Sequence, residues 1–179
     1  ASVFPLEKLD WLNGVYIREM DPQRLARLLL PVFEKAGYEV NVERLIQVVP
    51  LLQPRIKTLH DAVPMGGFFF EETFSPAPAE ELIQPKMDAM GTIRALEASR
   101  DALASLPGFD AAAQEAALRP LAKALGLKAG QLFGALRTAT TAQQIAPPLF
   151  ETMEILGRDE SLRRIDLAIE QLRAAQPEA

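Results

Sequence analysis

A chain of 179 residues in which 49% are hydrophobic is long enough to bury a core, in one domain or two small ones. It has no cysteine, which excludes disulfides and thiolate metal sites, and its single histidine, His60, cannot assemble an imidazole metal site. The apolar stretches are interrupted by charge well short of a membrane span, and no basic-then-apolar leader is found. A reducing cytoplasm is therefore the expected compartment, and no membrane partner is expected.

The net charge of −5 argues, as an average, against a nucleic-acid binder, because phosphate contacts dominate affinity for nucleic acids. The distribution of charge argues otherwise. Between Glu115 and Glu151, and again between Glu43 and Asp61, every charged residue is positive. The first window holds Arg119, Lys123, Lys128 and Arg137, and the second holds Arg44, Arg55 and Lys57. Exposed charges more than about 8 Å apart are largely screened, so each window can form a local positive surface. Chance spacing on solvated helices is the alternative.

Apolar residues recur at helical spacing in nearly every segment, and the alternation typical of strands is scarce, so the sequence predicts an all-α protein. The first helix is expected over residues 6–19. Asp21 and Pro22 then supply an N-cap and a first-turn proline for a second helix. Pro31 should kink this helix and Gly37 should end it.

Asn41 can cap a third helix, and Pro50 and Pro54 predict that this helix is bent or broken. Thr58 and Asp61 have the spacing of a capping box, which predicts a short helix before Gly66-Gly67.

An aromatic cluster, Phe68-Phe69-Phe70 and Phe74, follows the glycine pair. We interpret it as a core plug that joins two helical layers, since a stacking platform for bases is disfavoured by the adjacent acids Glu71 and Glu72. Prolines oppose helix on both sides of themselves, so the Pro76-Ala77-Pro78 stretch predicts a division of the chain near residue 77.

The remainder of the chain is also predicted to be helical, with start and stop signals at each element. The expected helices cover residues 86–106, 111–125 after Asp110, 129–139, a segment opened by Pro147 or Pro148 and ended by Gly157, and 160–175 after Asp159.

Motifs for catalysis are missing from the sequence. It contains no Gly-rich phosphate loop, nucleophile elbow or HExxH element. Adjacent carboxylates such as Glu80-Glu81 do not face each other on a helix, which favours solvated surface over an acid and base pair. The residues by themselves therefore indicate a binding module.

The run from Gly126 to Glu151 predicts a helix, a polar turn and a second helix. Arg137 precedes a stretch of small and amide residues that ends in Pro147-Pro148-Leu149-Phe150. Such a turn can offer a cation, backbone groups and apolar surface together, which are the groups that hold unstacked single-stranded bases. An ordinary interhelical loop is the plainer alternative.

Three stretches of the chain resemble the bacterial type of glutamyl-tRNA synthetase, in its C-terminal half. The first is Lys8-Leu-Asp-Trp11-Leu-Asn13-Gly14-Val-Tyr16-Ile-Arg18, and the second, Pro54-Arg55-Ile-Lys57-Thr58-Leu59, is similar to the family's Arg-x-x-Thr-Leu. The third lies between Gly126 and Gly157, with the elements Gly-x-Lys-x-Gly, Leu-Arg-x-Ala-x-Thr and Pro-x-Leu-Phe-Glu. Their order and spacing match, so the resemblance covers essentially the whole chain.

The resemblance implies an α-helical anticodon-binding region of a class I aminoacyl-tRNA synthetase, made of two packed helical subdomains. It implies that residues 1–20 are the tail of a stem-contact segment, and that 21–77 and 78–179 are the two subdomains. The parent enzyme joins glutamate to its tRNA using ATP and magnesium, and its ATP-binding motifs are missing here. The chain alone is thus expected to be non-catalytic, a fragment whose partners are the tRNA for glutamate and its own catalytic domain, in a monomer.

The resemblance also implies roles for single residues. Arg55 matches the arginine with which the family reads the third anticodon base, a task that suits the planar donor fork of a guanidinium. Arg137 matches the family's other anticodon-contacting arginine, and Pro147 and Leu149 match apolar positions beside the anticodon bases.

The turn departs from the family's pattern in two places. Ala146 replaces a Thr of some members, so only a backbone contact is expected there, and Ala142 replaces a frequent Gly, which affects the expected turn geometry. Trp11 and Tyr16 are expected in the core, because large aromatic residues at helical spacing usually pack inside. Phosphate contacts are expected from Lys57, Arg119, Lys123 and Lys128, and at best from Lys8 and Arg18 near the tRNA stem.

Two alternatives of a different kind are a free-standing helical scaffold that binds a protein partner, and a tRNA-binding module that exists without a catalytic half. The scaffold would show an exposed apolar groove and lack a positive face.

Overall fold

The computed structural model describes residues 5–176, and within that range every regular element is a helix. The prediction of an all-α protein is confirmed. The chain forms two compact units, residues 1–73 and residues 74–179. The division falls just before the Pro76-Ala77-Pro78 stretch, because Phe74 and Ala77 are both buried in the second unit.

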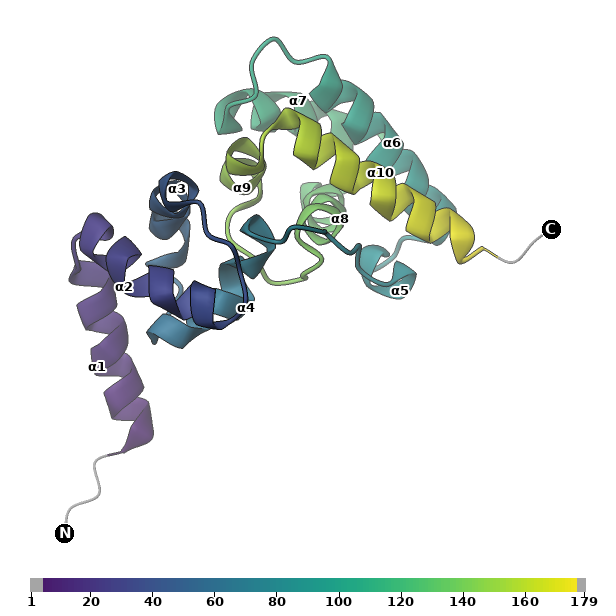
Figure 1. Ribbon diagram of the computed structural model, residues 1–179. Coiled ribbons are helices and arrows are strands. Elements are labelled where there is room, and N and C mark those ends of the chain that lie inside the picture. Colours follow the sequence, from purple (N-terminus) through teal and green to yellow (C-terminus); the bar gives the residue numbers. More distant parts are fainter. Residues whose placement is uncertain (1–4, 177–179) are drawn as a thin grey trace. The chain divides into compact units, whose positions relative to one another are not determined.

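The first unit consists of α1 (Leu6–Glu19), α2 (Pro22–Lys35), α3 (Val42–Leu52), η1 (Leu59–Asp61), α4 (Ala62–Gly66) and η2 (Gly67–Phe69), as Figure 1 shows. Two predicted caps are confirmed: Asp21 accepts a hydrogen bond from the backbone N–H of Arg24 at 3.0 Å, and Asn41 accepts one from Arg44 at 2.9 Å. The apolar faces of α2 and α3 then pack together and bury Leu25, Leu29, Phe33, Leu45, Val48, Val49 and Leu52.

The aromatic run at residues 68–70 completes this core. All three phenylalanines are buried, and the ring of Phe70 meets that of Phe33 edge-on with a centroid separation of 5.1 Å. Gly67 lies so close to Tyr38 that a Cβ there would come within 2.8 Å of the tyrosine Cζ. The interpretation of the run as core is therefore confirmed, and a base-stacking platform at these rings is excluded.

Pro50 does not break α3. Pro50 lies inside α3, which continues to Leu52, and Pro54 lies beyond its end. Proline removes one backbone hydrogen bond from a helix, but the buried Val49 and Leu52 hold the last turn in place.

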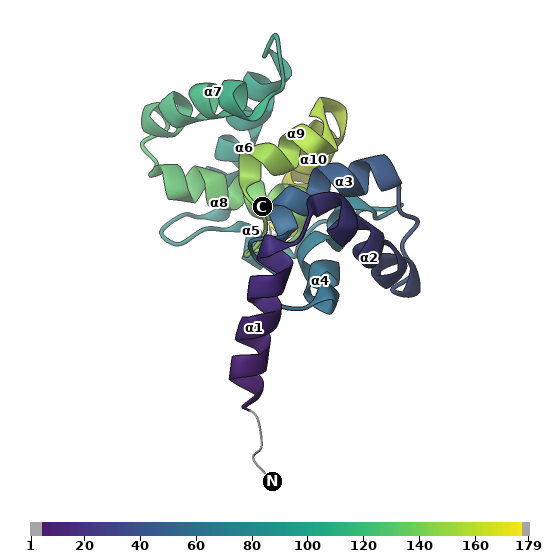
Figure 2. The same ribbon diagram turned by 90° about the vertical axis from the view of Figure 1, so that its left-hand side faces the viewer.

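α1 shows that one prediction is wrong. Trp11 and Tyr16, expected in the core, are 61% and 69% exposed. Gly14 and Ile17 are the buried residues of this helix, and the two large aromatic side chains lie on other parts of its surface. Figure 2 shows how α1 projects from the other helices of its unit.

The second unit consists of α5 (Ala79–Leu82), α6 (Ala89–Ala104), α7 (Ala111–Ala124), α8 (Ala129–Thr141), α9 (Leu149–Leu156) and α10 (Arg158–Ala174). α6 and α10 lie side by side (Figure 1). α8 contacts each of the other helices of this unit, and its buried Leu132, Ala135 and Leu136 belong to the common core. The helix that carries Arg137 is therefore the central element of the unit.

The helix predicted over residues 86–106 is shorter in the structure. α6 begins at Ala89, because the Asp88 carboxylate accepts a hydrogen bond from the Gly91 N–H at 2.6 Å and caps the helix there. The preceding residues 83–88 form a loop in which Lys86 has a left-handed φ of +65°.

The last helix also starts at a different residue from the predicted residue 160. α10 begins at Arg158, directly after Gly157, whose φ of +85° turns the chain out of α9. Asp159 therefore lies in the first turn of α10 and does not cap it, contrary to the prediction. The cap by Asp110 is confirmed, since its carboxylate accepts from the Ala113 N–H at 2.9 Å.

Candidate nucleic-acid interface

Arg55 lies on the turn that follows α3 in the first unit. Its backbone N–H donates to the Leu52 carbonyl at 2.8 Å, and its side-chain Nη1 donates to the Leu51 carbonyl at 2.9 Å. The side chain is exposed and forms no ion pair among the residues that the structure describes. Most guanidinium donors therefore remain available to a ligand.

Gln53 connects this turn to α1. Its buried amide donates to the carbonyls of Ile17 at 2.8 Å and Met20 at 2.7 Å, which satisfies acceptors at the end of α1. The turn with Arg55 and the end of α1 are thus fixed to each other by one side chain.

The segment after Arg55 is fixed by the predicted capping box. The Asp61 carboxylate accepts from the backbone N–H groups of Lys57 at 3.0 Å and Thr58 at 2.9 Å, while the Thr58 hydroxyl accepts from the Asp61 N–H. Partial burial acts to raise the pKa of Asp61, but the hydrogen bonds to its ionised form prevail and lower it below the usual range.

Two predicted cations of this unit meet beside Gly14. A Cβ at that glycine would lie 3.0 Å from Nη1 of Arg18 and 3.7 Å from Cγ of Lys57, so both side chains cover α1 at the buried Gly14. Lys8 is exposed near the start of the same helix. The first unit therefore presents Arg18 and Lys57 together as a positive surface.

Arg137 lines a groove of about 660 Å³ in the second unit, which we call the Arg137 groove. One wall is the loop at residues 83–88, the floor is α8, and the remaining wall is the turn after α8. The lining side chains include Ile83, Gln84, Lys86, Met87, Thr138, Gln144 and Ile145. The Arg137 guanidinium has no hydrogen bond or ion pair to the residues described, so its donors are available in the groove.

Threonine hydroxyls complete the C-terminal end of α8. Thr140 donates to the Leu136 carbonyl at 2.8 Å, and Thr141 donates to the Arg137 carbonyl at 2.7 Å. Ala142 then takes a left-handed conformation with φ +56° and donates its N–H to the Thr138 carbonyl. The turn thus keeps a backbone geometry that favours glycine although alanine occupies the position.

A buried arginine fixes this same end of α8. Arg164 of α10 is 2% exposed, donates to the Thr140 carbonyl at 2.9 Å, and stacks on the Phe74 ring at 4.1 Å from its centroid. Its Nε donates to Glu160 at 2.7 Å. Hydrogen bonds from Arg163 first, and from Arg164, outweigh the effect of burial and lower the pKa of Glu160 to about 2.

Pro147 and Leu149, the two apolar residues predicted beside the bases, are both buried. Leu149 is 5% exposed and packs in the core of the unit, and neither residue lines the Arg137 groove. The apolar surface at this turn comes instead from Ile145, whose side chain is 82% exposed. Sequence reasoning missed this residue; its position within the polar stretch Gln143-Gln144-Ile145-Ala146 was the available signal.

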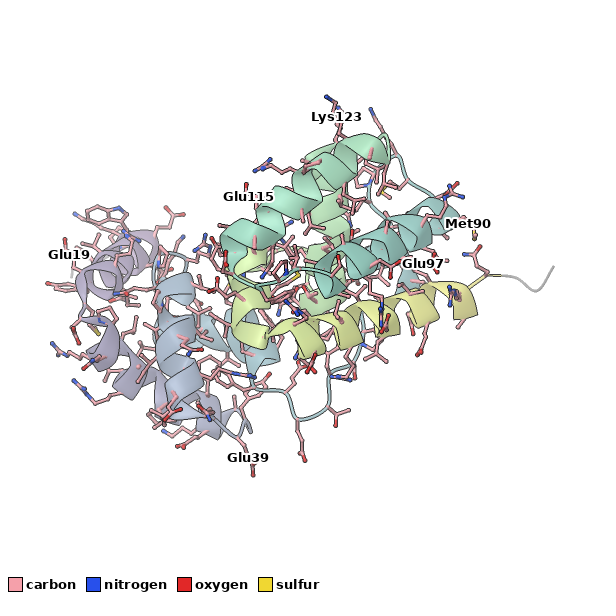
Figure 3. The ribbon with its side chains drawn as sticks, turned by 90° about the horizontal axis from the view of Figure 1, so that it is seen from above. Glu19, Glu39, Met90, Glu97, Glu115 and Lys123 are labelled. Carbon is pink, nitrogen blue, oxygen red and sulfur yellow. The ribbon has the colours of Figure 1, made fainter. Side chains whose placement is uncertain are left out.

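The other predicted cations of the second unit differ in their surroundings. Arg119 forms an ion pair with Glu115, 2.5 Å apart, and lies over the Phe133 ring at 5.5 Å from its centroid. Lys123 projects into solvent from the last turn of α7, as Figure 3 shows. Lys128 precedes α8, where its backbone N–H donates to Gln131 Oε1 at 2.9 Å. The positive charge of Arg119 is thus partly neutralised by Glu115, whereas the Lys123 side chain is exposed to solvent.

No cluster of three or more metal-ligating side chains occurs within residues 5–176, and no helix there has the length and apolarity needed to cross a membrane.

Two glutamate–tRNA ligases match most of the chain. The glutamate–tRNA ligase of Dehalococcoides mccartyi strain BAV1 is 46% identical over 177 residues, which cover 96% of this chain and 36% of that protein. The glutamate–tRNA ligase of Roseiflexus castenholzii is 44% identical over 178 residues, or 96% of this chain and 35% of that protein. The chain therefore spans about a third of the length of the relatives it matches.

Two solved structures resemble this fold, and the model of one protein family matches the sequence. A glutamate tRNA ligase from Elizabethkingia meningosepticum, crystallised in complex with its amino acid, is similar with a TM-score of 0.77 at 27% identity, over 94% of this chain and 33% of that chain. The glutamate-tRNA synthetase of Elizabethkingia anophelis gives 0.74 at 26% identity, over 93% and 32%. The profile of the anticodon binding domain matches residues 24–169, which span most of both units, and the chain belongs to this anticodon binding domain family.

Proposed function

We propose that the chain recognises the anticodon of the tRNA for glutamate, as the anticodon-binding part of a glutamate–tRNA ligase. The observation that carries the proposal is the Arg137 groove, in which an unpaired guanidinium lies beside the exposed Ile145. A guanidinium and an apolar side chain together suit an unstacked base, which needs hydrogen-bond donors at its edge and a surface for its face. The names of the similar proteins support the choice of tRNA and amino acid.

In this proposal the two units bind different parts of the anticodon loop. Arg55 reads the third anticodon base, and Arg137 holds another base in its groove. Pro147 and Leu149 act through their buried packing, which positions the backbone of the turn. The exposed cations Lys57, Lys123 and Lys128, together with Arg18, Lys8 and the partly neutralised Arg119, contact phosphates and position the loop without reading sequence.

The catalytic steps belong to a part of the longer protein outside this chain. ATP and magnesium are assigned to that part, because the chain offers neither their binding motifs nor, over residues 5–176, a metal-ligand cluster. We assign contact with it to the large side chains that α1 exposes on more than one side, which are Leu6, Leu9, Trp11 and Tyr16. We further propose a cytoplasmic, monomeric enzyme.

The test is binding of the chain to full-length tRNA for glutamate and to the same tRNA with its third anticodon base changed, each at two salt concentrations. Selective binding that the base change weakens supports anticodon readout. Binding that depends on salt but not on the base would mean that phosphate contacts dominate, and it would contradict the proposal.

Variants refine this test. Arg55→Ala should remove discrimination at the third base, worth about 1–3 kcal/mol for one good base contact. Arg27→Ala is the matched control, because Arg27 is also an exposed arginine of the first unit. Equal loss of binding to both tRNAs in Arg55→Ala would refute its role as a reader.

A further inference from the structure

We propose that Gln84 is a second base-reading residue, whose carboxamide acts with Arg137 on the same unstacked base. The inference rests on the proposed anticodon recognition and deepens it. None of the sequence motifs described above contains Gln84. It lies in the loop between α5 and α6, far from Arg137 along the chain. The fold brings the two side chains into one groove.

The position of Gln84 depends on a glycine in α8. A Cβ at Gly134 would lie 2.9 Å from Cδ of Gln84, and closer still to its Oε1, so the amide packs directly on the helix backbone. Gly134 lies one helical turn before Arg137, and both residues line the Arg137 groove. The loop itself is tied to α8, since Gln131 donates to the Pro85 carbonyl at 3.0 Å. The Gln84 amide is therefore held against α8 one helical turn before the residue that carries the guanidinium.

The amide retains hydrogen-bonding capacity in this position. Its Nε2 makes one long bond, 3.4 Å, to the Leu82 carbonyl, and its Oε1 accepts no hydrogen bond from residues 5–176. Arg137 can only donate, whereas a carboxamide both donates and accepts. Every base presents donors as well as acceptors at its pairing edge, so an arginine alone cannot match that edge but an arginine with an amide can.

The lining of the groove combines charges of both signs with apolar surface, which suits an uncharged base. Glu81 partly offsets the positive charges of Arg137 and Lys86, so the groove is not purely cationic. Ile83 and Met87 of the loop and Ile145 of the turn after α8 also line the groove and provide apolar surface for a ring. Lys86 at the exposed tip of the loop is the group suited to a flanking phosphate.

Two substitutions test the proposal without touching Arg137. Gln84→Ala removes the amide. Gly134→Ala adds a methyl group where the amide lies, so it displaces a flexible side chain while alanine keeps the helix. Gln171→Ala is the matched control, since Gln171 is an exposed glutamine of α10 in the same unit.

The measurement is the affinity of each variant for tRNA with every base in turn at the first and second anticodon positions, and at the third as reference. We expect both test variants to lose about 5-fold to 50-fold in discrimination at one of the first two positions, with third-position discrimination and thermal stability kept. Unchanged discrimination at the first two positions, or an equal loss of binding to all tRNAs, would overturn the role of Gln84 and leave the proposed function standing. If the unsubstituted chain distinguishes no anticodon variant, the proposed function fails and this inference fails with it.

Discussion

Replacing Glu160 with glutamine should destabilise the second unit in a way that depends on pH. Glu160 has a pKa of about 2 in the folded chain, against an ordinary value of 4.5, because Arg163 and the buried Arg164 donate to its carboxylate. A carboxylate with a depressed pKa contributes stability above the unfolded value of 4.5, and that stability is lost as the pH falls towards 2.

The size of the effect follows from these two pKa values. At pH 3 the unfolded chain binds a proton at this group and the folded chain largely does not, which corresponds to a loss of about 2 kcal/mol relative to pH 7. The Glu160 side chain is 29% exposed, so solvent screening reduces the loss of stability. We expect a loss of about 1 kcal/mol between pH 7 and pH 3. Glu160→Gln does not titrate, so its deficit relative to the unsubstituted chain should shrink by that amount between pH 7 and pH 3.

The assay is urea denaturation at both pH values. Unfolding of the second unit is monitored by hydrogen exchange in peptides from α8 and α10. A probe in these helices is needed because the single tryptophan, Trp11, lies in the first unit. Glu170→Gln is the control, since Glu170 is an exposed carboxylate of the same helix. A deficit of Glu160→Gln that is equal at pH 7 and pH 3 would refute the link between the arginine pair and the pKa.

Three further substitutions have expected outcomes. Ala142→Gly should raise the free energy of unfolding of the second unit by about 0.5–1 kcal/mol, measured by urea denaturation, because glycine adopts a φ of +56° without strain. Gln53→Ala should cost about 1–3 kcal/mol and increase hydrogen exchange in α1, since the Met20 carbonyl loses the amide donor and the Ile17 carbonyl keeps only the Met20 N–H. Ile145→Ser should weaken tRNA binding while leaving the melting temperature unchanged, because the side chain is exposed; a lowered melting temperature would instead indicate a packing role.

The starts of α2, α3 and α7 could be predicted from the sequence because their signals are local. Asp21, Asn41 and Asp110 each cap a helix through the N–H three residues ahead, a contact that depends on neighbouring residues alone. The capping box of Thr58 and Asp61 is another contact of this kind.

Two errors are local, the predicted starts of α6 and α10, and the others concern features that depend on packing between distant segments. Helical spacing in α1 does not reveal which side of the helix meets the rest of the unit, so Trp11 and Tyr16 were expected inside and are exposed. The burial of Leu149 follows from the way α9 packs in the second unit. The approach of Gln84 to Gly134 joins a loop and a helix that are far apart in sequence, and no local pattern indicates it.

The central position of α8 affects the kinetics with which the chain would distinguish one tRNA from another. Because α8 packs against every other helix of its unit, the backbone beneath Arg137 cannot shift to accommodate a mismatched base without repacking the core. A reader preorganised in this way lowers the entropic cost of binding the cognate loop. Wrong and right tRNAs should then associate at similar rates, and the distinction between them should lie in residence time.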